Sequence, residues 1–277
     1  MNSKEMSLKA RIRNYAKKSG LTAQVVLQNF MFERFLARLS RSDYRDKFVI
    51  KGGVLIAAIV GLDMRSTMDI DTTLRGLPLE EEKVRTAVES IGNVALDDNV
   101  AFRIVSVEPI RKDDHYGGYR VKIEAVYDTI STMFSVDVTT GDVITPGAVQ
   151  YEFNGILDET EQISLWGYNI ETVMAEKAET ILRRGVFNTR PRDYYDVYIL
   201  GTTQKYSRKV FRDALMATAA HRGTSELISD PAAIVSRIST DGDLQVMWAK
   251  YQNQFPYARK IQYADIISVL KSLLDLR

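Results

Sequence analysis

Cysteine is absent from the 277 residues of this chain, and histidine occurs only twice, at His115 and His221. The lack of cysteine excludes disulfides, cysteine-ligated zinc and thiol catalysis, and it favours a reducing compartment. The scarcity of histidine argues against a histidine-rich metal site and against a Ser-His-Asp triad. Either histidine could still act alone, but we expect both to be ordinary polar residues.

Long hydrophobic runs are also missing. The longest, VLIAAIV at 54–60, lies far below the roughly 20 apolar residues that span a bilayer. The first residues, MNSKEMSLKARIRNYAKK, lack the apolar segment of a signal peptide. With 45% hydrophobic and 26% charged residues, the composition is that of an ordinary globular protein. We therefore expect a cytoplasmic protein that makes no membrane contact.

The net charge is only +1, but positive and negative residues are distributed unevenly along the chain. Acidic residues are few at 1–51 and at 183–212, and basic residues are the minority at 52–171. Residues 1–51 carry 12 Lys/Arg against 4 Asp/Glu, residues 52–171 carry 9 against 21, and residues 183–212 carry 8 against 2. Solvated helix faces would explain this pattern. The sharper interpretation is an acidic, metal-binding centre between two basic segments that contact phosphates or nucleic acid.

Hydrophobic periodicity predicts an α+β middle and a helical last third. We expect helices at 4–18 and from Thr22 to about residue 42, with Thr22 as the cap of the second. We expect a domain boundary near residue 165, which divides the chain into 1–165 and 166–277. The further predicted elements are strands at 48–50, 68–74, 101–110, 118–127 and 133–140, helices at 54–60 and 79–91, and helices beyond 170 that include one ending at Gly185 and one opening at Pro191.

Two acids occupy alternate positions in the predicted strand MDIDTTL. Asp69 and Asp71 therefore project from one face, whereas Ile70 points into apolar packing on the other. Adjacent carboxylates repel each other, and a divalent cation between them removes that cost. Mg²⁺ suits such a site, because it prefers oxygen ligands and is commonly held by a few carboxylates and substrate phosphates. An exposed acid pair without metal is the alternative.

Two further features surround the acid pair. Gly52 and Gly53 precede it by one helix length, and glycine lets backbone N–H groups approach a phosphate closely. Asp137, in FSVDV, lies on a later predicted strand and could sit beside the pair across the sheet. Three carboxylates and a glycine turn predict a two-metal centre for phosphoryl or nucleotidyl transfer. Alternatively, Asp137 caps a hydrogen-bond network without metal.

Three blocks of sequence together resemble a known family. These are KGGVLIAAIVGLDMRSTMDID, ETVMAEKAETILRRG and TRPRDYYDVYIL, in this order. They are similar to the motifs of the AbiEii/AbiGii/MenT nucleotidyltransferase toxins, within the DNA polymerase β-like superfamily, over roughly residues 45–200. The glycine pair stands where the wider superfamily usually has Gly-Ser, and the gap to Asp69 is longer than in that pattern. That spacing suits the toxin branch. The resemblance implies a polymerase β-like nucleotidyltransferase domain with a mixed sheet, followed by a helical domain.

Residue by residue, the resemblance implies a nucleotide site in the first block. Gly52 and Gly53 would form the turn that approaches the phosphates. Asp69 and Asp71 would hold Mg²⁺, and Asp137 would complete the acidic cluster as a metal ligand or act as the base on the incoming hydroxyl. The segment before the acids would contact nucleotide phosphates through Arg65, Ser66 and Thr67.

The resemblance assigns catalytic roles in the helical part as well. Lys177 would meet the triphosphate, Arg192 would lie near it, and Asp193 would be a nearby or catalytic carboxylate. Alternatives without a catalytic role stay open. Glu176 and Lys177 could form a solvated pair, and an exposed ion-pair network could link Arg192, Asp193 and Asp196. The nearby tyrosines fit core packing better than base stacking; they are Tyr194, Tyr195 and Tyr198.

The activity implied by the resemblance is transfer of a nucleotide from an NTP, with Mg²⁺, to an RNA acceptor such as the 3′ end of a tRNA. It also implies a toxin–antitoxin system that acts in abortive infection by phage, with a separately encoded winged-helix antitoxin that need not bind the toxin. Two other functions stay open. One is a nucleotidyltransferase that modifies a small molecule or a protein, and the other is a nucleotide- or RNA-binding regulator without catalysis.

Overall fold

The computed structural model describes residues 3–65, 67, 69–110 and 117–276. The chain divides into two compact units. Unit 1 comprises Met1–Asp142 and Val149–Gly167, and unit 2 comprises Val143–Ala148 and Tyr168–Arg277. The backbone therefore passes between the units three times, after Asp142, after Ala148 and after Gly167.

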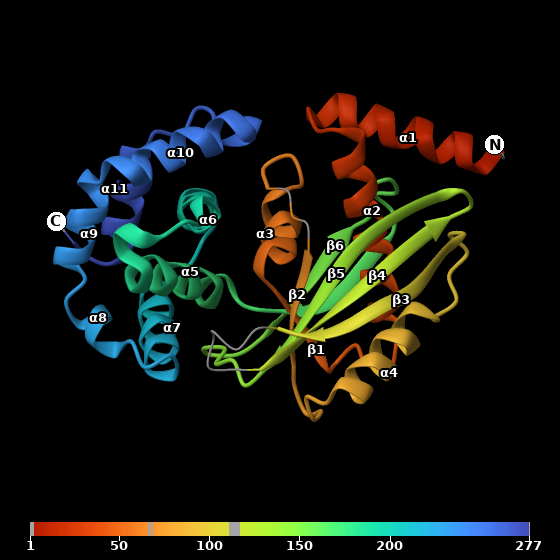
Figure 1. The fold of residues 1–277 in the computed structure, drawn as a ribbon, viewed down its shortest axis with the longest axis horizontal. Coiled ribbons are helices and arrows are strands. Elements are labelled where there is room, and N and C mark those ends of the chain that lie inside the picture. Colours follow the sequence, from red (N-terminus) through yellow and green to blue (C-terminus); the bar gives the residue numbers. More distant parts are fainter. Residues whose placement is uncertain (1–2, 66, 68, 111–116, 277) are drawn as a thin grey trace. The chain divides into compact units, whose positions relative to one another are not determined.

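Unit 1 is built on a seven-stranded sheet in the order β3-β4-β5-β2-β1-β7-β6 (Figure 1). The β2–β5 and β1–β7 pairs are parallel, and the other neighbours are antiparallel. This mixed sheet confirms the predicted α+β class. Its elements are α1 (Ser3–Ser19), α2 (Ala23–Ser40), β1 (Phe48–Lys51), α3 (Gly52–Val60), β2 (Asp69–Leu74), α4 (Glu81–Gly92), β3 (Val100–Pro109), β4 (Gly118–Tyr127), β5 (Ile130–Thr140), β6 (Val149–Asn154) and β7 (Gln162–Gly167).

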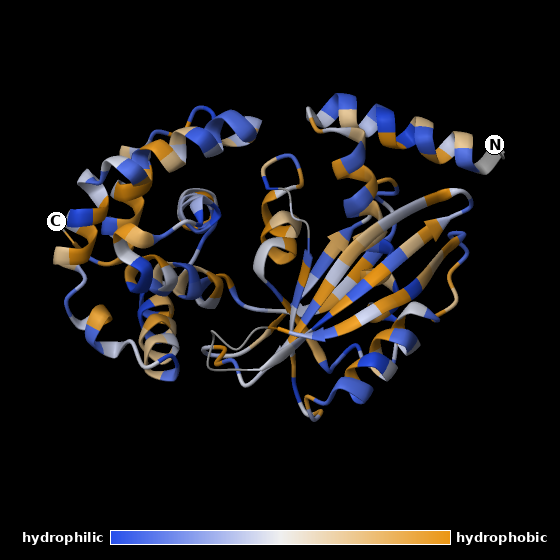
Figure 2. Cartoon of the chain, viewed as in Figure 1, coloured by the Kyte–Doolittle hydropathy of each residue, from blue (hydrophilic) through white to orange (hydrophobic). Residues whose placement is uncertain are grey.

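The central strands separate an apolar face from a polar face. On β2 and β5, Ile70 and Val136 are fully buried and lie opposite each other, as strand alternation requires. Aromatic rings of α2 cover this face, with the ring of Phe32 centred 5.1 Å from that of Phe134. Apolar and polar residues alternate along β3, β4 and β5 in Figure 2. The acids of β2 consequently belong to the face that does not hold the aromatic core.

The two predicted N-terminal helices are present. Thr22 caps α2, since its hydroxyl accepts a hydrogen bond from the backbone N–H of Val25 at 3.3 Å. α1 buries Leu8 and Ile12, whereas most of its other residues are hydrophilic (Figure 2). A helix of this kind uses one narrow apolar stripe for packing and presents its charges elsewhere.

Unit 2 is helical, with α5 (Ile170–Arg184), α6 (Pro191–Thr203), α7 (Arg208–His221), α8 (Ser225–Ser229), α9 (Ala232–Thr240), α10 (Gly242–Gln254) and α11 (Tyr263–Leu273) as its α-helices. The predicted stop at Gly185 is confirmed, and its φ of 53° is one that glycine adopts without strain. Pro191 begins α6, as predicted. Among the described residues, no helix is long and apolar enough to cross a membrane.

Three local features differ from expectation. β6 and β7 were not predicted, and they extend the sheet beyond β1. The helix predicted at 54–60 begins at Gly52, so β1 continues into α3 without an intervening loop. The predicted hairpin turn after β3 falls largely outside the described residues, which resume at Gly117.

Candidate functional site

A row of charged residues crosses the polar face of the sheet. Asp71 on β2 lies opposite Lys51 on β1 and opposite Asp137 on β5. Asp137 in turn lies opposite Arg120 on β4. Neighbouring strands are about 4.8 Å apart, so four charged residues, two of each sign, occupy one line across four strands. Asp69 projects from the same face as Asp71, two positions earlier on β2.

Arg120 binds Asp137 through two hydrogen bonds. Its Nε and a terminal nitrogen donate to the two carboxylate oxygens at 2.8 and 2.7 Å. The hydrogen bonds to Asp137 raise the pKa of the guanidinium above its ordinary value, and the negative charges of Asp137, Asp69 and Asp71 raise it further, against the opposing effect of burial. Sequence reasoning missed this arginine, because nothing local in GYRVKIEAVY tells which strand lies beside it.

Gly52 and Gly53, which the sequence predicts as a turn that approaches phosphates, are the first two residues of α3. Gly52 has a φ of +63°, and a Cβ there would fall 2.1 Å from Oδ2 of Asp71. A Cβ on Gly53 would fall 2.7 Å from the hydroxyl of Thr67 and 3.2 Å from the guanidinium of Arg65. Both positions therefore need glycine, because the start of α3 touches the segment that leads into β2.

The segment before the acids is largely enclosed. Arg65 is 3% exposed and Thr67 is 5% exposed, and the Thr67 hydroxyl donates to the carbonyl of Asp69 at 3.2 Å. Arg65 and Thr67 therefore pack the segment that precedes β2 against the N-terminus of α3. Ser66, which the sequence placed between them as a nucleotide contact, lies outside the described residues.

A second ion pair on the polar face joins Lys51 to Asp142, with Nζ 2.5 Å from Oδ2. The same oxygen accepts hydrogen bonds from the hydroxyls of Thr73 and Thr139. Burial opposes ionisation of Asp142, but the Lys51 charge and these hydrogen bonds outweigh it and lower its pKa to about 2. This pair ties the end of β5 to β1 beside the glycine turn, and sequence reasoning did not find it.

The donor set fits Mg²⁺ at the two acids of β2. Within the described residues, no three His, Cys, Asp or Glu side chains are gathered so as to share a metal ion. Asp69 and Asp71 nevertheless share one face of one strand, and Mg²⁺ is commonly bound through one or two carboxylates plus substrate phosphates. Asp69 and Asp71 would therefore hold the ion and a nucleotide would complete its ligands, whereas both oxygens of Asp137 are engaged by Arg120.

A second charged cluster lies in unit 2, between α5 and α6. The ammonium of Lys177 is 2.8 Å from Asp193 and 3.2 Å from Asp196. Both carboxylates are buried, and the lysine side chain is 17% exposed. Arg190 adds a weaker ion pair to Asp193, at 3.4 Å. The structure thus brings Lys177 and Asp193 together in one ion pair.

The alternatives without a catalytic role, which the sequence left open for this region, have different outcomes. Glu176 binds Arg222 at 3.0 Å and Lys177 binds buried acids, so the solvated-pair alternative is wrong. Burial of Asp193 and Asp196 contradicts an exposed network. Arg192 does not join the cluster in any described contact and lies over the ring of Phe255, 5.4 Å from its centre. Core packing is confirmed for the two fully buried tyrosines, Tyr194 and Tyr195.

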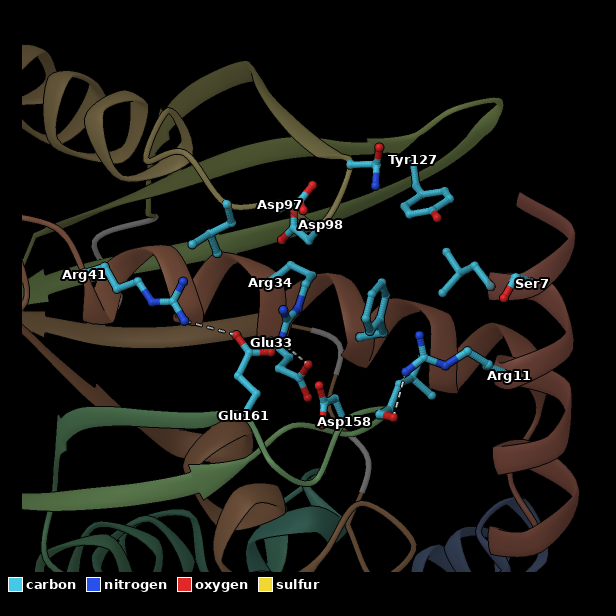
Figure 3. Close-up of a pocket in the computed structure, with 15 residues that line it drawn as sticks. Ser7, Arg11, Glu33, Arg34, Arg41, Asp97, Asp98, Tyr127, Asp158 and Glu161 are labelled. Atoms are coloured by element: carbon cyan, nitrogen blue, oxygen red, sulfur yellow. Dashed lines mark hydrogen bonds and ion pairs between the residues drawn. The ribbon is translucent and has the colours of Figure 1, made fainter. Parts of the chain in front are cut away.

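A pocket of about 630 Å³ opens elsewhere in unit 1, among α1, α2 and the β6–β7 connection (Figure 3). Its floor is an ion-pair network in which Arg34 binds both Glu33 and Glu161 at 2.5 Å. Burial raises the pKa of Glu33, against the lowering effect of the Arg34 charge. None of the acids of β2 lines the pocket.

Two solved structures share the fold of this chain. A crystal structure of a nucleotidyltransferase from H. pylori matches 92% of this chain and 96% of its own, with 14% identity and a TM-score of 0.52. The structure of JHP933 from Helicobacter pylori matches 92% of this chain and 94% of its own, with 13% identity and a TM-score of 0.50. At these identities the likeness concerns the fold alone. A search of curated proteins found no match.

The sequence itself matches a family model over residues 34–268, a span that contains the glycine turn, the paired acids, and the Lys177 cluster. The description of that family is "Nucleotidyl transferase AbiEii toxin, Type IV TA system". This chain is therefore an enzyme of the AbiEii nucleotidyltransferase toxin family, which acts in type IV toxin–antitoxin systems.

Proposed function

We propose that this toxin transfers a nucleoside monophosphate from an NTP to an RNA acceptor, at the 3′ end of a tRNA. The observation that carries the proposal is the pairing of Asp69 and Asp71 on one strand face, with the Asp71 carboxylate against the backbone of Gly52. Such a site offers oxygen ligands to Mg²⁺ and a backbone that a phosphate can approach. Mg²⁺ would neutralise phosphate charge and orient the triphosphate there.

The reaction needs little covalent chemistry from the protein. An acceptor hydroxyl oxygen attacks the α-phosphorus of the NTP, a new P–O bond forms, and the bond to pyrophosphate breaks. The hydroxyl proton passes to Asp137, whose oxygens keep lone pairs besides those that accept from Arg120. Catalysis then consists mainly of positioning and of electrostatic stabilisation of the departing pyrophosphate, which we assign to Lys177.

We further propose the cellular setting that the family suggests. The acceptor RNA binds the basic segments 1–51 and 183–212, whose net charges are +8 and +6. The toxin works in the cytoplasm during phage infection and causes abortive infection. A type IV system has an antitoxin, for which we propose a separately encoded winged-helix DNA-binding protein.

Label transfer tests the reaction. Each NTP, labelled at the α-phosphate, is incubated with total RNA and with total protein in the presence of Mg²⁺. We expect label in RNA for the wild type, loss of about 2 to 4 kcal/mol of transition-state stabilisation for Asp69→Asn or Asp71→Asn, and wild-type rates for Asp213→Asn, an exposed control outside the basic segments. Label in protein or in a small molecule would show that the acceptor belongs to that class and is not RNA. The absence of label from RNA, protein and small molecules would point to a regulator without catalysis.

A further inference from the structure

We infer that Arg120 is a positioning residue that stands in for a second metal ion, so that the candidate site takes a single divalent cation, at Asp69 and Asp71. The inference rests on the proposed function, because it concerns the same acidic face. It differs from the two-metal centre that the sequence predicts, and it assigns a role to a side chain outside the family-like motifs.

The geometry supplies the first argument. Asp137 stands next to Asp71 across the parallel β2–β5 pair, where the sequence predicts a third metal ligand. Arg120 reaches Asp137 from the opposite neighbour, β4, and engages both carboxylate oxygens at 2.8 and 2.7 Å. A metal ion that bound Asp137 would have to share its oxygens with the Arg120 guanidinium or displace it, and a bidentate guanidinium–carboxylate pair is among the stronger protein hydrogen-bonded pairs.

Electrostatics supplies the second argument. Asp69, Asp71 and Asp137 bring three negative charges to one face, and Arg120 feels all three. Lys51 lies in the same row, but its ammonium is bound to Asp142, which adds a fourth carboxylate. One divalent ion together with Arg120 balances the three acids. A second divalent ion would be placed within a few ångströms of the guanidinium, where like charges repel strongly.

Exposure makes the assignment testable without unfolding the protein. The Arg120 side chain is 44% exposed, on the solvated face of β4. Replacing it therefore removes no core packing. Arg103 on β3 offers a matched control, because it is also an exposed sheet arginine in an ion pair, with Glu124, and it forms no described contact with Asp69, Asp71 or Asp137.

The experiment counts bound Mn²⁺, used as the probe, by the loss of the free-ion EPR signal on titration of the full chain. We expect one ion per wild-type chain, lost in Asp69→Asn and Asp71→Asn and kept in Asp137→Asn. Arg120→Gln should acquire a second site, or bind its one ion at least about tenfold more tightly, because the variant removes a positive charge close to the cation. Arg120→Lys, which keeps the charge, and Arg103→Gln should both bind one ion as the wild type does.

The count separates this inference from the activity. It is overturned if the wild type binds no ion, if it binds two ions of which one is lost in Asp137→Asn, or if Arg120→Gln binds Mn²⁺ as the wild type does. If the expected counts hold but no NTP labels any acceptor, the proposed function fails while the role of Arg120 stands. If transfer to RNA occurs but the wild type binds two ions, the proposed function stands and the role assigned to Arg120 fails.

Discussion

A side chain at position 52 would have no room. Gly52 has a positive φ, and a methyl group would meet the Asp71 carboxylate at 2.1 Å. Gly20 provides the control, because its φ is also positive, at +70°, but nothing lies within 4 Å. We expect Gly20→Ala to cost about 1 kcal/mol of unfolding free energy from backbone strain alone. Gly52→Ala should cost about 3 kcal/mol and abolish NMP transfer, since Asp71 must move.

Urea unfolding of both variants measures the difference. Equal losses for Gly20→Ala and Gly52→Ala would mean that the Asp71 side chain moves aside without cost, and would remove the argument for glycine at this turn.

We expect the Lys177 ammonium to contribute both to catalysis and to the stability of the fold. It faces Asp193 and Asp196, which are 3% and 0% exposed, so removing it leaves buried carboxylates without their main cation. We expect Lys177→Met to lose NMP transfer and also about 3 kcal/mol of unfolding free energy, as broken buried ion pairs do. Lys250→Met, at an exposed position of α10 outside the basic segments, should change neither. A Lys177→Met chain as stable as the wild type would show that the carboxylates become protonated or hydrated at little cost.

At the scale of elements, α1 is the clearest test of the basic segments. Its charges at Arg13, Lys17 and Lys18 are exposed. Arg183, in the second basic segment, is a poorer choice because it pairs with the fully buried Glu179 at 3.2 Å. We expect the triple Gln variant of α1 to bind RNA with a flatter dependence of log K on log salt, by about 0.7 to 0.9 for each phosphate that the variant no longer neutralises.

Fluorescence anisotropy with a labelled tRNA at several salt concentrations gives that slope. The triple Gln variant of Lys83, Arg85 and Arg103 removes the same charge outside the basic segments and should keep the wild-type slope. Identical slopes for both triple variants would leave α1 as a solvated helix.

Elements with local signals were predictable, and those that depend on distant pairing were not. Thr22, Gly185 and Pro191 mark helix ends in the sequence because caps and breakers act within one turn. β6 is the exception, because VQYEFN alternates apolar and polar residues as a strand does and was nevertheless missed. The strand order places Arg120 beside Asp137 and Asp142 beside Lys51, and no short stretch of sequence contains that information.

The whole molecule should respond to acid through Asp142. Its pKa in the folded chain is about 2, below the ordinary value of 3.8, so its contribution is present above pH 3.8 and is lost as the pH falls toward 2. The shift corresponds to about 2 kcal/mol at neutral pH. Asp142→Asn should lose that amount and flatten the dependence of unfolding free energy on pH in this window. Asp43→Asn, at an exposed site, should leave the curve unchanged, and a curve unaltered by Asp142→Asn would contradict the role of Lys51.

The sheet order also has a consequence for synthesis on the ribosome. β1 lies inside the sheet between β2 and β7, yet β7 is the last strand in the chain. Until residues 162–167 leave the exit tunnel, β1 keeps an open hydrogen-bonding edge, and such edges attract wrong partners and chaperones. A nascent toxin therefore cannot complete the strand that carries Lys51 and leads into Gly52 until more than half of the polypeptide has emerged.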